Sequence, residues 1–370
     1  MNRTAYRFDP RLERASTLPS WCYLDSWLET EEKRSIFART WQLAGHSAAV
    51  ISPGDFFTTN VAGEPVIVVR GRDGMLRALS NICRHRAGPV AKGSGNRPVF
   101  QCGYHGWTYR LDGSLGGTPE MAGIECFEAS DFSLPSFRVE EWLGLVFVNL
   151  DPDAAPLLSQ LQDLPERLER RGLDSFRLAE RKDWTIECNW KVYVDNYLEG
   201  YHIPIVHPSL FQELDYSQYR TETRDIYSIQ HAPLKRRERL RSQSPDDRAE
   251  YFWIYPNLML NVYPDNFSTN LIVPLSPTRT MTIFEWYFAD PEMARQDIGA
   301  TIAYSDEIQI EDIDICETVQ RNLASATYSA GRFSPQRENG VHHFHGLLAK
   351  SLGKVLTDPL DGIPGAANLT

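Results

Sequence analysis

Two short cysteine–histidine pairs constrain this chain more than any other feature. His85 follows Cys83 by two residues, His105 follows Cys102 by three, and sixteen residues separate the pairs. Two thiolates and two imidazoles from two loops make a metal-binding set. They fit a closed tetrahedral zinc site. They fit equally a [2Fe–2S] cluster in which two cysteines hold one iron and two histidines hold the other.

The residues around the pairs favour the iron–sulfur cluster. The second pair continues into Gly106 and the aromatic Trp107, and the first continues into Gly88. Both segments have the character of glycine-bearing loops closed by aromatic side chains, which is unlike a zinc knuckle. We therefore predict a Rieske-type [2Fe–2S] cluster, held by Cys83, His85, Cys102 and His105.

Length, charge and cysteine content indicate a cytoplasmic, two-domain protein. The 370 residues are two to three times a typical domain. The net charge of 38 − 49 = −11 includes no long run of like charges, so nucleic acid is not expected as a partner. The first residues lack the apolar segment of a secretory signal, and no stretch is apolar enough to span a membrane. Six cysteines are too few for a disulfide scaffold at this length, which suits a reducing compartment.

Hydrophobic patterns divide the chain into two regions of different type. Strand signals dominate residues 39–152, including a hairpin over 64–81, and predict a small all-β domain around the cysteine–histidine pairs. Residues 1–38 and 153–370 are expected to form a larger domain in which helices pack on an antiparallel sheet. Its strands are predicted at 258–263, 270–275 and 280–289, and a long helix, capped by Asp290, is predicted to reach Leu323. The fold class is therefore α+β.

A second metal site is predicted from a pair of histidines in the larger domain. His202 and His207 stand five residues apart, which on an unbroken helix would point them to different sides. Pro204 and Pro208 interrupt the backbone there, so both imidazoles can converge. A histidine pair alone is more often packed or exposed than metal-bound. With one carboxylate it would complete the facial triad of non-haem Fe(II) oxygenases.

The third ligand is sought on the long helix, where two adjacent carboxylates compete. Asp312 aligns with Ile308 and Cys316 at helical spacing, so it interrupts an apolar face. A carboxylate inside such a face is costly unless it is paired or bound to metal. Glu311 instead aligns with Asp314 on the expected solvated face. We therefore choose Asp312 as the ligand.

With both sites identified, the chain resembles the Rieske non-haem iron oxygenase α subunits over nearly its whole length. The catalytic-domain signature is carried by Asn189-Trp190-Lys191, by 196–207 and by Glu311-Asp312. Within that family the chain is more similar to the branch of carnitine and choline monooxygenases and glycine betaine demethylase, because of residues 196–199, 261–264 and 340–345. One departure is Ala87, where the family usually carries glycine.

The resemblance implies partners and further residues. It implies a homotrimer in which the cluster of one chain lies beside the mononuclear Fe(II) of its neighbour, and a reductase that delivers electrons from NAD(P)H through flavin and iron–sulfur groups or a ferredoxin. In the family an acid links the iron ligand to the second cluster histidine, and Glu199 matches it, bridging His202 and the neighbour's His105. Glu199 lies three residues before His202, so on a helix it would share its side. Asp195 belongs either to the electron route or to the solvated surface.

The implied activity is reductase- and O2-dependent hydroxylation of a small organic substrate, either a quaternary ammonium compound, with oxidative N-demethylation as one outcome, or an aromatic ring. A rival of another class is an electron carrier or zinc-stabilised binding module, which would need only the first metal motif. Aromatic residues suggest a cage for a quaternary ammonium group, although packing in a sheet core explains them equally well: Phe252, Trp253, Tyr255, Tyr263, Phe267, Phe284 and Trp286.

Overall fold

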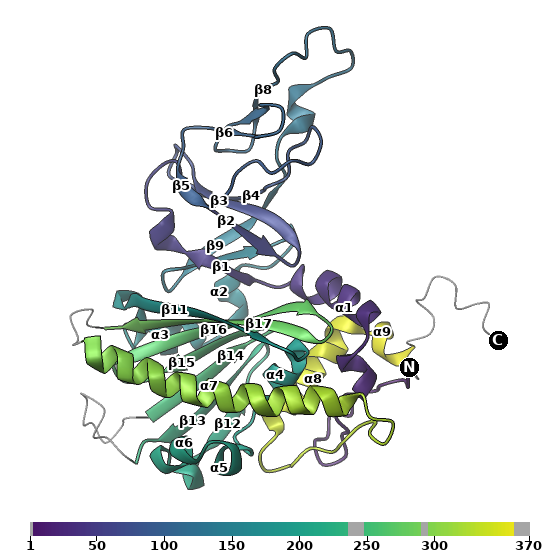
Figure 1. Ribbon diagram of the computed structural model, residues 1–370, viewed down its shortest axis with the longest axis vertical. Coiled ribbons are helices and arrows are strands. Elements are labelled where there is room, and N and C mark those ends of the chain that lie inside the picture. Colours follow the sequence, from purple (N-terminus) through teal and green to yellow (C-terminus); the bar gives the residue numbers. More distant parts are fainter. Residues whose placement is uncertain (1–2, 236–247, 290–294, 359–370) are drawn as a thin grey trace, which may run out of the picture. The chain divides into compact units, whose positions relative to one another are not determined.

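The computed structural model describes residues 3–235, 248–289 and 295–358, and the chain forms two compact units (Figure 1). The smaller unit is Lys33–Ser159, somewhat wider than the predicted 39–152. The larger unit joins Met1–Glu32 to Gln160–Thr370, so the small one is inserted into its sequence. No helix in the described ranges is long and apolar enough to cross a membrane.

The smaller unit is built almost entirely of strands. Its main sheet has the order β1-β10-β9-β4-β3-β2-β5, and a second sheet has the order β6-β7-β8. The hairpin predicted over 64–81 is confirmed, because β3 and β4 pair in antiparallel register from Val66–Ser80 to Arg70–Leu76. The strands are β1 (Gln42–His46), β2 (Asp55–Val61), β3 (Glu64–Arg70), β4 (Leu76–Ser80), β5 (Ser94–Asn96), β6 (Phe100–Gln101), β7 (Thr108–Tyr109), β8 (Leu115–Gly117), β9 (Ser136–Trp142) and β10 (Leu145–Asn149).

Both cysteine–histidine loops lie on the same core of this unit. The first loop follows β4, and the second connects β6 to β7. Cys83 and Cys102 are buried in one apolar cluster with Trp107 and Tyr109. Packing of both cysteines into this core therefore fixes the positions of the two loops. Short helical turns complete the unit: η2 (Lys33–Phe37), η3 (Ser47–Ala49) and η4 (Ala129–Phe132).

The larger unit contains one antiparallel sheet in the order β11-β17-β16-β15-β14-β13-β12. The three strands predicted in it are confirmed, and four others were not predicted. The charged stretch 235–250 has the composition of an exposed loop, but its end, from Arg248 onward, belongs to β14; residues 236–247 lie outside the described ranges. The strands are β11 (Arg177–Ile186), β12 (Arg220–Thr223), β13 (Tyr227–Pro233), β14 (Arg248–Ile254), β15 (Leu258–Val262), β16 (Asn266–Ser276) and β17 (Arg279–Phe288).

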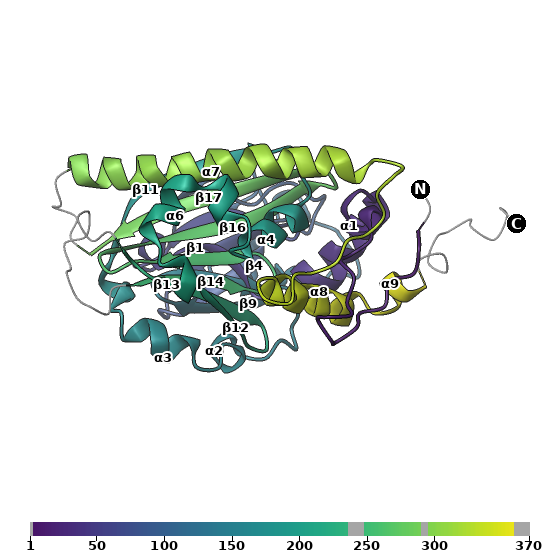
Figure 2. The same ribbon diagram turned by 90° about the horizontal axis from the view of Figure 1, so that it is seen from below.

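A long helix, α7 (Arg295–Leu323), runs along one face of this sheet (Figure 2). Its predicted cap at Asp290 lies outside the described residues. The helix α4 (Trp190–Tyr197) packs between α7 and β16. The remaining helices are α1 (Ser26–Glu32), α2 (Leu157–Gln160), α3 (Leu164–Glu169), α5 (Ile203–Val206), α6 (Pro208–Glu213), α8 (Asn339–Leu352) and α9 (Lys354–Thr357), with the turns η1 (Ser20–Tyr23), η5 (Leu173–Ser175) and η6 (Tyr216–Gln218).

A buried ion pair fixes the start of α4. The ammonium of Lys191 lies 2.5 Å from Glu32 of α1, and the two side chains are 1% and 2% exposed. The indole N–H of Trp190 donates to the other carboxylate oxygen of Glu32 at 2.8 Å. Both charges are desolvated, so each depends on the other for compensation. Asn189 caps α4 by accepting the backbone N–H of Lys191.

Removing one partner of this pair should destabilise the larger unit strongly. We expect Lys191→Ala to lower the free energy of unfolding by about 3–5 kcal/mol, because Glu32 would be left buried and uncompensated. The double variant Glu32→Gln/Lys191→Met should recover much of that loss. Urea unfolding followed by tryptophan fluorescence would measure both. A double variant no more stable than Lys191→Ala would contradict the assignment of the loss to an unpaired charge.

Candidate functional site

The two cysteine–histidine loops repeat the same backbone hydrogen bonds. The carbonyl of Cys83 accepts from the N–H of Ala87, and its own N–H donates to the carbonyl of Gly88, at 3.0 and 2.8 Å. In the second loop the carbonyl of Cys102 accepts from Gly106 and its N–H donates to Trp107, also at 3.0 and 2.8 Å. Each cysteine therefore begins a turn of equal length.

This repeat explains why Ala87 is an unusual residue. Ala87 and Gly106 occupy equivalent positions, and both have left-handed backbone, with φ of 56° and 74°. Glycine adopts that conformation without steric cost, whereas an L-residue with a Cβ pays about 1 kcal/mol or more. The departure from the family's usual glycine at this position therefore affects the backbone of the first loop.

The donor set in these loops fits an iron–sulfur cluster. Both cysteines are buried, which favours metal-bound thiolates over reactive surface thiols. The Nδ1 atom of His85 is buried and has no hydrogen-bond partner among the described residues. A buried polar atom needs a partner, and a metal ion would provide one. The ring of His85 stacks on Trp107 at 5.0 Å and lies 4.6 Å from the ring of His105, centroid to centroid, so the two imidazoles are neighbours.

Tyr109 donates a hydrogen bond to one of the cysteine sulfurs. Its hydroxyl oxygen accepts the backbone N–H of Arg84 at 2.9 Å and lies 3.2 Å from Cys83 Sγ. Because the oxygen already accepts from Arg84, its proton is free to point at the sulfur. Burial, together with Cys83, raises the pKa of Tyr109 well above its ordinary value. The hydroxyl therefore stays protonated and serves as a donor to sulfur.

In the larger unit, a broken segment brings His202 and His207 together. The helix α4 ends at Tyr197, and a turn follows. Gly200 lies in this turn, where an added Cβ would stand 2.6 Å from the ring of Tyr219. His202 precedes α5, and His207 separates α5 from α6. The prediction that prolines interrupt this segment and let both imidazoles converge is confirmed: their ring centroids are 5.0 Å apart.

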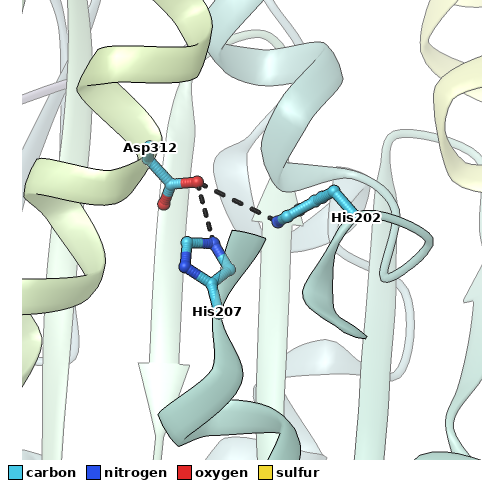
Figure 3. A group of neighbouring side chains, drawn as sticks. All are labelled: His202, His207 and Asp312. Atoms are coloured by element: carbon cyan, nitrogen blue, oxygen red, sulfur yellow. Dashed lines mark hydrogen bonds and ion pairs between the residues drawn. The ribbon is translucent and has the colours of Figure 1, made fainter. Parts of the chain in front are cut away.

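Asp312 of α7 faces both histidines, as Figure 3 shows. Its Oδ1 atom lies 3.0 Å from Nε2 of His207 and 3.9 Å from Nε2 of His202. One ligand atom from each of the three residues falls within 4.8 Å of the others. A facial triad consists of two imidazoles and one carboxylate that bind a metal ion from the same side. The residues present therefore fit a mononuclear iron ion.

Each histidine of this triad is also held by a second carboxylate. Glu199 Oε1 lies 2.6 Å from Nδ1 of His202, and Glu311 Oε2 lies 2.6 Å from Nδ1 of His207. The expectation that Glu311 faces solvent is therefore wrong: it is 28% exposed and in contact with His207. The expected helical alignment of Glu199 with His202 is also wrong, since α4 has ended, and a turn brings the two side chains together.

The carboxylates create a strongly negative setting for His207. Burial opposes the charged form of this imidazole, but the hydrogen bonds and charges of Asp312 and Glu311 outweigh it and raise its pKa. These carboxylates therefore favour positive charge at the 2% exposed imidazole of His207. This is the electrostatic condition that a divalent cation requires.

Two polar groups beside the triad were not identified from the sequence. The amide of Asn196 donates to Asp312 Oδ1 at 2.5 Å. Tyr193 donates to Gln309 Oε1, whose amide in turn donates to Thr282 at 3.1 Å. Asn196 lies in the last turn of α4, and no local pattern in the sequence indicated its contact with Asp312. Its contact depends on the packing of α4 against α7.

Asp195 points away from the triad. Its carboxylate accepts from the hydroxyl of Tyr23 at 2.7 Å and contacts His345 Nε2 at 3.0 Å. Because Nδ1 of His345 accepts the N–H of Leu18, its Nε2 carries the proton and donates to Asp195. The alternative in which Asp195 belongs to the solvated surface is therefore wrong, because its carboxylate is held by Tyr23 and His345. It does not line the cavity described next.

A cavity of about 810 Å³ opens onto the triad. Of the aromatic residues suggested for a cage, Tyr263, Phe284 and Trp286 line it. Others belong to the core: Trp253 packs on Phe344 at 5.3 Å and Phe267 on Tyr287 at 4.4 Å. Five tyrosines that were not predicted also line the cavity: Tyr193, Tyr197, Tyr219, Tyr251 and Tyr304.

Comparison with known families matches both units. Residues 40–128 match the Rieske [2Fe-2S] domain, and residues 173–354 match the ring hydroxylating alpha subunit (catalytic domain). The chain is 36% identical to the chloroplastic choline monooxygenase of Arabidopsis thaliana, over 95% of this chain and 87% of that protein. It is 32% identical to the carnitine monooxygenase oxygenase subunit of Acinetobacter pittii, over 91% and 95% of the two.

Solved structures give the same result. The quaternary ammonium Rieske monooxygenase CntA in complex with L-carnitine superposes with a TM-score of 0.83 at 30% identity, covering 94% of this chain and 99% of that one. Naphthalene 1,2-dioxygenase from Rhodococcus sp. superposes at 0.74, with 20% identity and coverage of 91% and 94%. This second likeness shows the fold alone.

The matches define the class of protein: the chain belongs to the Rieske non-haem iron oxygenase α subunits. It is an oxidoreductase, the oxygenase component of a multi-component system that works with a reductase and O2. Its Rieske domain carries a [2Fe–2S] cluster and its catalytic domain carries a mononuclear iron. The rival interpretation as an electron carrier or binding module does not fit a chain so similar to monooxygenases.

Replacing Tyr109 tests the hydrogen bond to the cluster ligand. We expect Tyr109→Phe to lower the reduction potential of the Rieske cluster, because a donated hydrogen bond stabilises the more negative, reduced form. A hydrogen bond of about 1 kcal/mol corresponds to on the order of 40 mV for one electron. Redox titration followed by circular dichroism measures the shift. An unchanged or higher potential would show that Tyr109 does not donate to Cys83, and Tyr104→Phe, on the exposed side of the loop, provides the control.

Proposed function

We propose that this protein hydroxylates a quaternary ammonium compound at the site formed by His202, His207 and Asp312. These three residues would hold the mononuclear iron, while Cys83, His85, Cys102 and His105 would hold the cluster. The observation that carries the proposal is the convergence of the triad on a cavity with aromatic and acidic walls. When bound, the cluster would supply electrons one at a time and the iron would supply the activation of O2.

The overall reaction consumes the substrate, O2, two electrons and two protons, and it yields the hydroxylated substrate and water. If the hydroxylated carbon carries the nitrogen, the product is a hemiaminal that collapses to an aldehyde and an amine. This step needs no further oxidant. The protein's task is therefore to place one C–H bond near the triad and to keep bulk water out.

The walls of the cavity support a cationic substrate. Eight aromatic residues line it, and tyrosine and tryptophan rings attract quaternary ammonium groups through their faces. The hydroxyls of Tyr251 and Tyr263 lie 3.0 Å apart and hold the two rings nearly perpendicular, at 79°. Two rings held at this angle present aromatic surface from two directions, which is the kind of wall that attracts a quaternary ammonium group.

The charges of the cavity narrow the substrate further. Six of its described lining residues are carboxylates, and none of the lining residues in the described ranges is lysine or arginine. Two of the carboxylates, Glu199 and Asp312, belong to the metal site. Among the described residues, Asp265 and Glu307 each accept from a neutral donor, the Asn266 amide at 2.8 Å and the Ser209 hydroxyl at 3.3 Å, and neither hydrogen bond brings a positive charge to the carboxylate. We therefore propose a substrate without a carboxylate, of the choline type rather than the carnitine type.

A substrate panel tests this proposal. With a suitable electron donor, we expect kcat/KM for choline to exceed that for L-carnitine and γ-butyrobetaine by on the order of tenfold or more, because each zwitterion brings a carboxylate among like charges. Product analysis by mass spectrometry and substrate-dependent O2 uptake provide the measurement. Oxidation of naphthalene but of no ammonium compound would refute the proposal in favour of ring hydroxylation. Preference for carnitine would refute its charge component.

Charge removal in the cavity sharpens that test. Asp265→Asn should raise KM for choline roughly threefold, because one partly screened attraction is lost. It should also lower the ratio of kcat/KM for choline to kcat/KM for L-carnitine. The matched control is Glu166→Gln, whose side chain is 69% exposed on α3 and pairs with Arg170. This control should change neither KM for choline nor the preference for choline over L-carnitine.

We also propose that the protein is a trimer in which electrons cross between subunits, from a cluster to the mononuclear iron of the neighbour. Apolar residues beside both metal sites are exposed, as an interface would require: Tyr104 is 57% exposed, Tyr201 57% and Ile205 83%. His105 is exposed on the cluster loop. Glu199 would bridge His202 and the neighbour's His105. A separate NAD(P)H-dependent reductase, acting directly or through a ferredoxin, would reduce the cluster.

Mixing two inactive variants tests the crossing between subunits. His105→Ala should disable the cluster, and Asp312→Ala should disable the mononuclear site. When the two variants are co-expressed in equal amounts and assemble at random, a quarter of all junctions would join an intact cluster to an intact iron of the next chain. About a quarter of wild-type activity is therefore expected from the whole population, and each mixed trimer would contribute one productive junction of three. Activity near zero in verified mixed trimers would mean that electrons stay within a chain and would contradict this arrangement.

A further inference from the structure

Glu311 and Asp312, adjacent on α7, contact the two nitrogens of the same imidazole. Asp312 Oδ1 lies 3.0 Å from Nε2 of His207, and Glu311 Oε2 lies 2.6 Å from its Nδ1. His202 has a comparable arrangement, with Glu199 2.6 Å from Nδ1 and Asp312 3.9 Å from Nε2. Each ring therefore turns Nδ1 to a supporting carboxylate and Nε2 to the centre of the triad.

This arrangement determines the tautomer of the neutral ring. An ionised carboxylate only accepts hydrogen bonds, so Nδ1 of His207 must donate to Glu311. Nε2 of the neutral ring then carries no proton and presents its lone pair toward Asp312. A histidine that donates its second nitrogen to a carboxylate is held in orientation and becomes a more basic metal ligand.

The contact is placed where it controls orientation. His207 is 2% exposed and its backbone lies between two short helices, α5 and α6, with non-helical dihedral angles of −120° and 72°. Neither helix includes His207, so the orientation of its ring depends on the side chains that contact it. Glu311 comes from α7, a 29-residue helix, so the support shares one rigid element with Asp312.

We propose that Glu311 is a positioning residue, which holds the Nδ1–H form and the ring direction of His207 so that Nε2 and Asp312 Oδ1 meet on one divalent cation. This inference rests on the proposed function, because it takes His202, His207 and Asp312 as the metal ligands. Glu311 does not line the cavity in the described part of the chain. Its effect passes through His207.

Glu311 and Glu199 perform this task under different constraints. Both oxygens of Glu199 are engaged, one by His202 Nδ1 and the other by the backbone N–H groups of Tyr201 and His202. Glu199 is also the proposed bridge to a neighbouring subunit. In the described part of the chain Glu311 accepts no backbone N–H group, and no such second role is proposed for it. Replacing Glu311 should therefore affect metal binding without disturbing the route between subunits.

Calorimetric titration with Co(II) tests this inference. The protein used is the full chain, stripped of its mononuclear metal but retaining the cluster, which is checked by its absorption spectrum. We expect Glu311→Ala to weaken Co(II) binding roughly 10- to 100-fold, the usual effect of losing such a support. Glu311→Gln should lose less, because its amide oxygen still accepts from Nδ1. The matched control Asp314→Ala, at an exposed position of the same helix, should bind Co(II) as the wild type does.

The comparison with Asp312→Ala separates two kinds of failure. If Asp312→Ala abolishes Co(II) binding while Glu311→Ala binds within about twofold of wild type, the site stands and the role of Glu311 is overturned. If Asp312→Ala also binds normally, the metal assignment itself fails. Equal losses in Glu311→Gln and Glu311→Ala would overturn positioning through a hydrogen bond, since the acceptor is present in only one of them. Glu311→Gln has nearly the same shape as the native residue and keeps the test available if Glu311→Ala does not fold.

Discussion

The carboxylate of Asp312 is the point on which the catalytic unit depends. It is 15% exposed, and a largely buried carboxylate is costly unless donors or cations surround it. Asn196 and His207 approach its Oδ1 atom from two different segments, and His202 stands slightly further away. A divalent cation would complete the compensation. The packing of α4 on α7 brings Asn196 to Asp312, and the broken segment after α4 brings the two histidines. The cavity opens onto the same residues.

The negative charge around this centre extends into the cavity and links metal binding to substrate choice. Glu199 and Glu311 hold the histidines, and further carboxylates line the walls beyond. Together they favour cations at short range, both at the metal and in the substrate. Aromatic faces add attraction for a group that cannot donate hydrogen bonds, which is the nature of a quaternary ammonium ion.

Local patterns in the sequence predicted the parts of the site whose geometry is local. The cysteine–histidine loops, the proline interruptions around His202 and His207, and the apolar setting of Asp312 each depend on residues close in sequence. The contact of Glu311 with His207 was not predicted, because helical spacing identifies the faces of α7 but not the residues that pack against each face. Glu311 lies on the side that would be solvated if His207 did not cover it.

The same limit applies to the fold and to the cavity. Strand signals located β15, β16 and β17, but β11 to β14 carry more mixed patterns and depend on their partners in the sheet. Alternation could not tell which aromatic side chains face the cavity, since Tyr251 lines it while Trp253, on the same strand, packs against Phe344. At Ala87 the sequence showed only a departure from the family's usual glycine, and the left-handed backbone of this position became visible in the structure.

The most direct test of two metal sites in one chain is an iron count combined with EPR spectroscopy. Protein purified anaerobically should contain three irons per chain, two in the cluster and one at the triad, and should give a Rieske signal on reduction. Asp312→Ala should keep that signal and lose one iron. Zinc in place of iron, or an unchanged iron count in Asp312→Ala, would contradict the account.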